Sequence, residues 1–466
     1  MSETRIENDA FGPVEIPADR LWGAQTQRAL EVFGAQGEGF PPALIRAFGQ
    51  QKLAAARANL RLGVLPEPLA MAIQIAATQL AAGEFDAHFP LTVWQTGSGT
   101  QTNMNANEVI ANRANQWLGG ALGTKTPVHP NDHVNCSQSS NDSFPTVMHV
   151  ATALQIRDGL LPALTSLRSV LHDKALAWSG VLKIGRTHLM DAVPMTQGQA
   201  FDAFARQIGH GIDRVHGCLP RLRLLPQGGT AVGTGLNAPA GFDVAFCEAL
   251  SAITGEPFDT NPSKFEGMGT HDALVEVSGA LNVLAVSLSK IGNDIRWLGS
   301  GPRCGLGELL LPDDGLTSSI MPGKRNPTLA EVLVQACMQV MGNHFTITLA
   351  GASSTFELNV AKPVLIQNLL QSISVLSHAV TAFTDKLVIG LEVNGPQLSR
   401  NLDNALLMAT VLNPVLGYDK VAQITRKAAQ EGISPKAAAQ ALGFMTADDY
   451  ERLVRPEAMI TPGGQV

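Results

Sequence analysis

Residues 316–327 combine side chains that could bind and transform a small anion. They read Leu-Thr-Ser-Ser-Ile-Met-Pro-Gly-Lys-Arg-Asn-Pro. Asn326 is followed by proline and a long apolar-periodic run, which predicts a loop leading into a helix N-terminus, because Asn and Pro are preferred there. The free N–H groups and partial positive charge of such an end favour an anion. Lys324 would add a full positive charge, and Ser318 and Ser319 would add hydroxyl groups that exchange protons.

Three further clusters of polar residues stand beside expected helix starts. Any one of them could be only a set of helix caps, since Ser, Thr and Asn are favoured at that position. Together with Lys324 they make a pocket for a small substrate with two carboxylates, and this pocket needs no metal. The three clusters are Ser98, Gly99 and Thr100; Ser139, Ser140 and Asn141; and Gly185, Arg186, Thr187 and His188.

His188 is the residue of these clusters that has the chemistry for proton transfer near neutral pH. A lone histidine is more often a surface residue or a hydrogen-bonded core residue, and the chain has 11. Glu331 follows Lys324 by two helical turns of sequence, in the helix expected after the loop. Its carboxylate could hold an imidazole in one tautomer and raise its basicity, or it could interact only with the helix dipole. The spacing leaves both roles open.

Long helices are expected to position these clusters. Residues 271–298 place apolar side chains in steps of three and four throughout, which predicts a heptad seam about 40 Å long. Strand signals are weak, and short strands are expected only near 221–240 or the N-terminus. Further runs with the helical period cover about 196–222, 328–350 and 363–388.

The amount of apolar helix bears on the fold and on assembly. One subunit could not readily cover it, so we expect a mainly α fold with a long central helical bundle shared between subunits.

The glycine-rich run 228–235 lacks the strand-before, helix-after setting of a nucleotide-binding loop, so a nucleotide site there is rejected. The expected division is an N-terminal domain at 1–138, the central bundle at 139–392 and a small C-terminal domain at 393–466.

Composition excludes several classes of function. Hydrophobic residues make up 45% and charged residues 16% of the 466 residues, which is typical of a globular protein. The net charge of −7, without a basic run, argues against a nucleic-acid partner. The sequence indicates neither a membrane span nor a signal-peptide core. The five cysteines are scattered and form no C-x-x-C, which favours reduced thiols and a cytoplasmic location.

The order Ser-Ser-Ile-Met-Pro-Gly-Lys-Arg-Asn-Pro at 318–327 resembles the signature loop of the aspartase/fumarase superfamily. Within this superfamily the chain is similar to class II fumarate hydratases, from Leu21 to Tyr418. The resemblance implies a homotetramer whose active sites are shared between subunits. Two residues depart from the family pattern. Thr317 replaces the usual Gly, which would stiffen the loop, and Arg325 replaces a small apolar residue, which would add positive charge.

The activity implied by the resemblance is the reversible trans addition of water to fumarate, giving L-malate in the tricarboxylic acid cycle, with no cofactor and no metal. Ser318 would be the carbon base, and His188, oriented by Glu331, would activate or protonate the water. Lys324 and Asn326 would stabilise the charge that develops on a carboxylate. The other residues matched to the family's substrate-binding segments are Ser98, Gly99, Thr100, Ser139, Ser140, Asn141, Thr187, Ser319 and Arg325.

The resemblance also implies a second dicarboxylate site, in a short polar turn beside the catalytic site. Thr126 stands where some relatives have Arg, and Cys136 stands where they commonly have Lys. Both changes remove positive charge, so whether this site is occupied stays open. Such a turn is also ordinary loop material. Its residues are His129, Pro130, Asn131 and Asp132.

Three alternative functions are weighed on the sequence. An aspartase would release ammonia from aspartate. The family resemblance implies that aspartases have Gln at the position of His188, which argues against this function. A hydratase for a methylated fumarate analogue is harder to exclude, since one methyl group changes discrimination only modestly. A helical scaffold without activity would explain the heptad pattern but would leave the polar clusters without a purpose.

Overall fold

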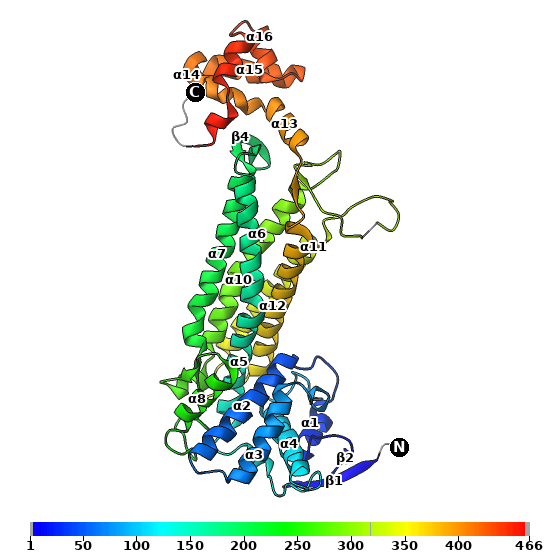
Figure 1. Ribbon diagram of the computed structural model, residues 1–466, viewed down its shortest axis with the longest axis vertical. Helices are drawn as coiled ribbons and strands as arrows, with labels where there is room; N and C mark the ends of the chain where they lie inside the picture. The colour runs from blue at the N-terminus through cyan, green and yellow to red at the C-terminus, as the bar shows by residue number, and fades with distance from the viewer. Residues whose placement is uncertain (1–2, 317, 462–466) are drawn as a thin grey trace. The chain divides into compact units, whose positions relative to one another are not determined.

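The computed structural model describes residues 3–316 and 318–461. Thr317, the residue expected to stiffen the loop, lies outside the described residues. The fold is mainly helical, as predicted (Figure 1). The chain forms two compact units, here called unit 1 and unit 2. Unit 1 holds residues 3–162, 211–285 and 336–377, and unit 2 holds 163–210, 286–316, 318–335 and 378–461.

In unit 1, helix α2 (Pro42–Arg61) packs against three other helices: α3 (Glu67–Ala81), α5 (Ser140–Gln155) and α8 (Phe242–Thr254). Helix α2 begins with proline, which is favoured in the first turn because its missing N–H would have no helical partner. The buried rings of Phe48 and Phe144 pack edge to face, with centroids 5.9 Å apart, and fix α2 against α5.

The remaining elements of unit 1 are two strand pairs and a set of mostly short helices. Strands β1 (Thr4–Asp9) and β2 (Gly12–Pro17) form an antiparallel hairpin, and β5 (Leu224–Leu225) pairs in parallel with β6 (Asp259–Thr260). The first pair and strand β5 lie where the sequence allowed short strands, whereas β6 lies outside those regions. The helices are α1 (Ala24–Phe33), η1 (Asp86–His88), α4 (Thr100–Trp117), η2 (Pro130–Val134), η3 (Ile156–Leu160) and α9 (Lys264–Gly269).

Five long helices each have residues in both units, and four of them match the predicted runs. The whole predicted seam of α10 is buried, from Leu274 to Leu298. The expectation that no segment has the length and apolarity of a membrane span is wrong, because residues 272–298 and 362–388 have both; their most apolar windows are 44% and 56% buried. The five are α6 (Leu161–Ala177), α7 (Gln197–Leu222), α10 (Asp272–Leu298), α11 (Thr328–Ala352) and α12 (Lys362–Phe383).

In unit 2, an antiparallel hairpin of β3 (Leu182–Thr187) and β4 (Met190–Thr196) lies outside the regions where strands were expected. The sequence signal is weak because Gly185 interrupts the first strand and no Asn-Gly or Asp-Gly marks the turn. A second antiparallel pair joins β7 (Leu309–Leu310) to β8 (Glu392–Val393).

The C-terminal part of unit 2 contains short helices around a small apolar core. Its buried members include Leu412, Ile424 and Tyr450. This matches the predicted change to short, more polar helices, while the predicted domain boundaries at 138 and 392 stay predictions. The helices are η4 (Thr384–Val388), α13 (Gly395–Asn404), η5 (Leu406–Leu412), α14 (Asn413–Leu416), α15 (Tyr418–Glu431), α16 (Pro435–Ala441), α17 (Ala447–Leu453) and η6 (Pro456–Met459).

Candidate functional site

The first polar cluster forms the turn before helix α4 in unit 1. Ser98 Oγ lies 2.9 Å from Thr100 Oγ1, and both residues are half-buried. Gly99 has φ of 75°, and a Cβ at this position would lie 2.1 Å from the ring of Phe144. Only glycine therefore fits between the two hydroxyl groups. The turn presents these hydroxyls at a helix N-terminus, where an anion is favoured.

The second cluster caps the N-terminus of helix α5. Ser139 Oγ accepts from Asn141 N, and the carboxylate of Asp142 accepts from Ser139 N over 2.9 Å, which is a capping box. Asp142 also accepts from the backbone of the glycine-rich run, at Gly228 N and Thr230 N. The run that the sequence excludes as a nucleotide cradle is thus docked on the first turn of α5.

One hydrogen bond joins the two clusters. Asn103 Nδ2, in the first turn of α4, donates to Ser140 Oγ over 3.0 Å. The structure therefore brings Ser98, Thr100 and Ser140 together on the N-terminal ends of two neighbouring helices in unit 1. Hydroxyl and amide groups in this arrangement suit a carboxylate ligand.

The proposed second site, residues 129–132, forms a tight turn in the same unit. His129 Nδ1 accepts from Asn131 N and Asp132 N, each over 3.2 Å, so the ring proton is on Nε2. Burial lowers the pKa of His129, and Lys125 and His133 lower it further although Asp132 opposes them. The imidazole is therefore neutral at pH 7, which leaves this turn with little positive charge for a dicarboxylate. Its role remains a prediction.

The third cluster lies in unit 2, at the tip of the β3–β4 hairpin. Thr187 ends β3, and His188 and Leu189 form the two-residue turn with φ of 54° and 61°. Both residues of such a turn need left-handed φ, which is uncommon for non-glycine residues and often marks a functional position. The side chains of Thr187, His188 and Leu189 are exposed.

The base of this hairpin is held by a buried carboxylate. Glu308 is fully buried, pairs with Arg186 and lies 3.1 Å from Lys183 Nζ. Its Oε2 is at ion-pair distance from Lys183 without hydrogen-bond alignment. Burial would raise the pKa of Glu308, but Arg186 and Lys183 outweigh it and lower the pKa. Burial also lowers the pKa of Lys183. The guanidinium of Arg186 stays charged at any ordinary pH, so the Glu308 carboxylate is ionised and paired with it.

The described residues of the fourth cluster, 316 and 318–327, form a largely exposed loop in unit 2. Ser318 Oγ accepts from Met321 N over 3.2 Å. Arg325 pairs with Asp313 at 2.8 Å, so the extra charge expected at this position has a counter-charge. Helix α11 begins at Thr328, one residue later than expected, so Pro327 lies just before the helix. Ser319 and Lys324 are exposed in the same loop.

Within one chain, the described residues show no hydrogen bond or ion pair between His188 and Glu331. This pairing, favoured by the resemblance, remains a prediction. His188 is exposed at the hairpin tip, and Glu331 is half-buried in the first turn of α11.

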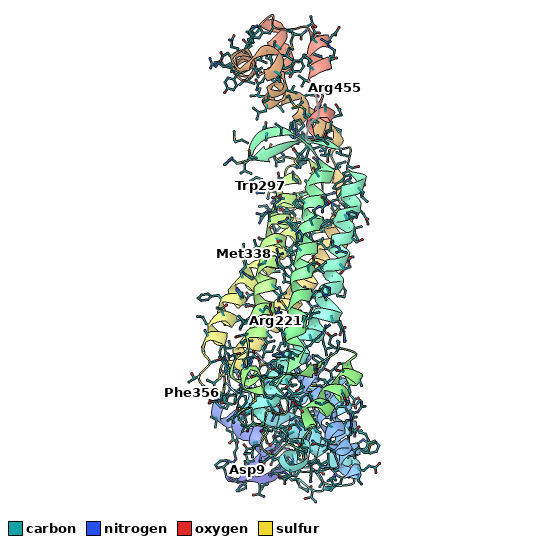
Figure 2. All side chains as sticks on the ribbon, turned by 90° about the vertical axis from the view of Figure 1, so that its left-hand side faces the viewer. Asp9, Arg221, Trp297, Met338, Phe356 and Arg455 are labelled. Atoms are coloured by element: carbon teal, nitrogen blue, oxygen red, sulfur yellow. The ribbon has the colours of Figure 1, made fainter. Side chains whose placement is uncertain are left out.

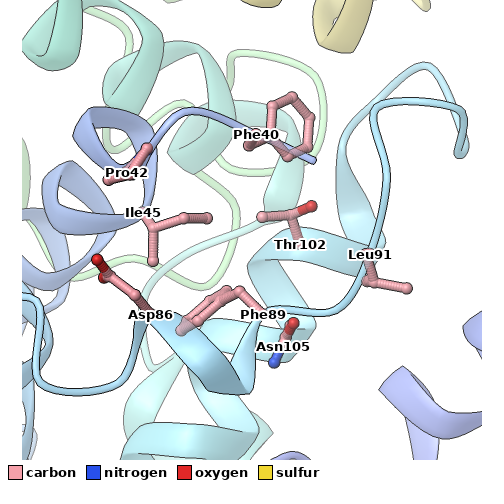
Figure 3. A pocket seen from close by; sticks show the side chains of 8 residues that line it. All are labelled: Phe40, Pro42, Ile45, Asp86, Phe89, Leu91, Thr102 and Asn105. Atoms are coloured by element: carbon pink, nitrogen blue, oxygen red, sulfur yellow. The ribbon is translucent and has the colours of Figure 1, made fainter. Parts of the chain in front are cut away.

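A small pocket of about 60 Å³ lies beside helix α4, on residues that the sequence did not single out (Figure 3). Thr102 and Asn105 contribute polar groups to the pocket. The charged residue that lines it is the acidic Asp86, and its lining contains no lysine, arginine or histidine. It therefore does not suit a dianion. The other lining residues are Phe40, Pro42, Ile45, Phe89 and Leu91.

Several residues that support the unit 1 clusters were missed in the sequence. Lys52 is the least expected, because it lies in an alanine-rich helix and is nevertheless fully buried. Its contacts are far away along the chain, so no local pattern could have revealed them. The others are Gln51, Asn135, Gln138 and Gln227.

Among the described residues, no group of three or more His, Cys, Asp or Glu could hold a metal ion. The geometry instead defines two helix ends in unit 1 with hydroxyl and amide groups. The expectation that Gly185–His188 stands beside a helix start is wrong, because His188 lies in a β-hairpin turn of unit 2. The family model described as Lyase matches residues 12–342, and a second model, Fumarase C C-terminus, matches residues 408–461. The chain is thus a member of this lyase family.

Comparison with individual proteins narrows the assignment. The chain is 55% identical to the mitochondrial fumarate hydratase of Rhizopus oryzae, over 99% of this chain and 94% of that protein. It is 53% identical to the class II fumarate hydratase of Caulobacter vibrioides, over 99% and 100%. The crystal structure of the class II fumarase from Schistosoma mansoni matches with a TM-score of 0.95 at 38% identity, over 99% and 100%. The chain belongs to the class II fumarate hydratase family.

Proposed function

We propose that the protein catalyses the reversible trans addition of water to fumarate to give L-malate, as a fumarate hydratase of the tricarboxylic acid cycle. The observation that carries this proposal is the identity of 53–55% over 99% of the chain to proteins named fumarate hydratase. The hydroxyl and amide groups gathered at the starts of α4 and α5 supply the binding chemistry that a dicarboxylate substrate needs.

In the proposed reaction the unit 1 clusters hold the substrate carboxylates. Ser98, Thr100, Ser139 and Ser140 offer hydroxyl groups, and Asn141 offers an amide, all at helix N-termini whose partial charge attracts an anion. Fixing both carboxylates places the double bond in one orientation, and orientation alone can contribute several kcal/mol to the barrier.

The chemical step is assigned to unit 2 residues. In the malate direction Ser318 acts as its oxyanion, which the Met321 N–H that bonds Ser318 Oγ helps to stabilise. The oxyanion takes the proton from the carbon next to a carboxylate and becomes a hydroxyl group, and the electron pair moves onto that carboxylate. Lys324 and Asn326 stabilise the charge that develops there. His188, oriented by Glu331 and acting as the imidazolium, then gives a proton to the leaving hydroxyl group, which departs as water and leaves a neutral imidazole. Thr187, Ser319 and Arg325 are assigned to substrate contacts beside these groups.

The active form is proposed to be a homotetramer with active sites shared between subunits. Met338 of helix α11 is labelled in Figure 2. On this helix, Met338, Phe345 and Leu349 are each more than half exposed. Their spacing of seven and four places them on one helix face, and an exposed apolar face of this kind fits a subunit interface. We also infer a cytoplasmic location, which the five free cysteines support.

The activity is tested by following the ultraviolet absorbance of the conjugated double bond when purified protein is mixed with malate, fumarate, aspartate or a methylated fumarate. Turnover of malate and fumarate with none of aspartate is expected. Release of ammonia from aspartate, or preference for the methylated analogue, would overturn the proposed substrate.

Shared sites are tested by mixing two inactive variants, His188→Asn and Ser318→Ala, after unfolding and refolding them together. If His188 and Ser318 of one site come from different subunits, hybrid assemblies contain some sites with both native residues and recover activity. If one chain supplies both, the mixture stays as inactive as each variant alone.

A further inference from the structure

Lys52 is a fully buried lysine on helix α2 whose ammonium group faces amide oxygens. Its Nζ donates to Gln138 Oε1 over 2.9 Å and to Asn135 Oδ1 over 3.2 Å. No carboxylate lies at ion-pair distance from it among the described residues. Burial lowers its pKa to about 7, with Asp142 opposing this effect at longer range. Burying an ammonium group without a neighbouring carboxylate costs free energy, so we expect Lys52 to have a functional role.

The ammonium group dictates how the surrounding amides are oriented. A lysine has only donors, so Asn135 must turn its oxygen and not its nitrogen toward Nζ. Asn135 Nδ2 then donates to the backbone oxygen of Gln138 over 3.1 Å, as observed. A flipped amide would place two donors against each other, so the cation excludes that state.

The orientation passes from Asn135 to the candidate substrate site. Asn135 Oδ1 also accepts from Asn103 Nδ2 over 3.2 Å, and the same Nδ2 donates to Ser140 Oγ over 3.0 Å. Since Ser140 Oγ accepts this bond, its O–H is left to donate elsewhere. Asn107 Nδ2 also donates to Asn135 Oδ1, over 3.2 Å, so Lys52 is the charged member of the donors that fix this amide. Through Asn135 and Asn103, Lys52 therefore contributes to the direction of the Ser140 hydroxyl.

We propose that Lys52 is a positioning residue that aims the Ser140 hydroxyl at a substrate carboxylate. This inference rests on the proposed function, in which Ser140 binds the dicarboxylate. Lys52 itself does not touch the substrate. Its effect is on binding, because a hydroxyl that donates outward binds a carboxylate and a hydroxyl that donates inward does not.

The first test replaces Lys52 by methionine, which keeps an unbranched side chain and removes every donor. The KM for fumarate and for malate, and the inhibition constant of a saturated four-carbon dicarboxylate, are expected to rise at least about tenfold. The value of kcat is expected to change less. The matched control is Asn115→Leu, which removes a buried amide of α4 that bonds only to the backbone of Val128. It is expected to lower the unfolding midpoint without raising KM.

A double-mutant cycle separates positioning from general packing. If Lys52 acts through Asn135, adding Lys52→Met to Asn135→Leu should leave KM close to that of Asn135→Leu alone. Additive effects in this cycle, or a KM and an inhibition constant unchanged in Lys52→Met, overturn the proposal.

A second variant, Asn103→Asp, decides the question if Lys52→Met does not fold. The change is isosteric, but the new carboxylate can only accept, so the Ser140 hydroxyl must turn inward; KM should rise at least about tenfold. An unchanged KM rejects the proposed direction of the Ser140 hydroxyl.

The variant Ser140→Ala separates failure of the proposed binding site from failure of the role of Lys52. If Ser140→Ala leaves KM unchanged, the binding site itself is wrong. If it raises KM while Lys52→Met does not, only the role of Lys52 is wrong.

Discussion

Asn401 Nδ2 donates to Glu308 Oε1 over 2.9 Å, so helix α13 shares one buried carboxylate with the hairpin that carries His188. Lys183 and Arg186, both on β3, bind the same carboxylate from the hairpin side. Glu308 thus fixes the base of a hairpin whose tip is exposed. The position of the His188 imidazole, the proposed general acid, therefore depends on a residue that lies 120 positions later in the sequence.

Replacing Glu308 by glutamine should loosen this hairpin. The change keeps the side-chain shape but leaves two buried cations without a counter-charge, which is expected to lower the unfolding free energy by about 3 kcal/mol. Chemical unfolding measures this loss, and kcat should fall as His188 loses its fixed position.

The control for Glu308→Gln is Asp449→Asn, which breaks an exposed ion pair with Arg452 elsewhere in unit 2. Only a small change in stability is expected there, because exposed pairs contribute little. Equal effects of the two substitutions would contradict the role given to Glu308.

The long helices could be predicted from the sequence, but the contacts that arrange the site could not. The seam from Leu274 to Leu298 follows the helical period, and this local pattern determines which side is buried. Lys52 and Asn135 are 83 residues apart, and nothing local indicates that their side chains meet. The His188 turn was missed for a related reason, since its left-handed residues are not the glycine or asparagine that mark such turns.

Replacing Ser318 by alanine should remove the carbon base. A fall in kcat of at least about a hundredfold is expected, as for the loss of a general base. Steady-state rates with malate measure it. Ser319→Ala provides the comparison, because a residue that only contacts the substrate should raise KM more than it lowers kcat. Turnover near the wild-type rate in Ser318→Ala would exclude Ser318 as the base.

His188→Asn tests the imidazole without disturbing the turn, because asparagine tolerates the left-handed φ of 54° at this position. The expected result is a fall in kcat of about a hundredfold or more with the hairpin intact. Leu189→Asn, which places the same side chain at the neighbouring left-handed position, should retain turnover. If both variants lose activity equally, the effect comes from the turn and not from the imidazole.

Acid should destabilise unit 1 through two buried, neutral histidines. Burial lowers the pKa of His149 to about 4, although its ring N–H donates to Leu222 O over 2.8 Å, and burial lowers the pKa of His271 well below its usual value. Between pH 6.5 and 4 the unfolded chain binds a proton that folded His149 does not. Stability is therefore full above pH 6.5 and falls as the pH is lowered, by on the order of 3 kcal/mol for this residue. Unfolding midpoints measured across this range should show the loss, and His149→Gln, which keeps a donor for Leu222, should make the slope shallower. An unchanged slope in this variant would mean that His149 is protonated in the folded protein.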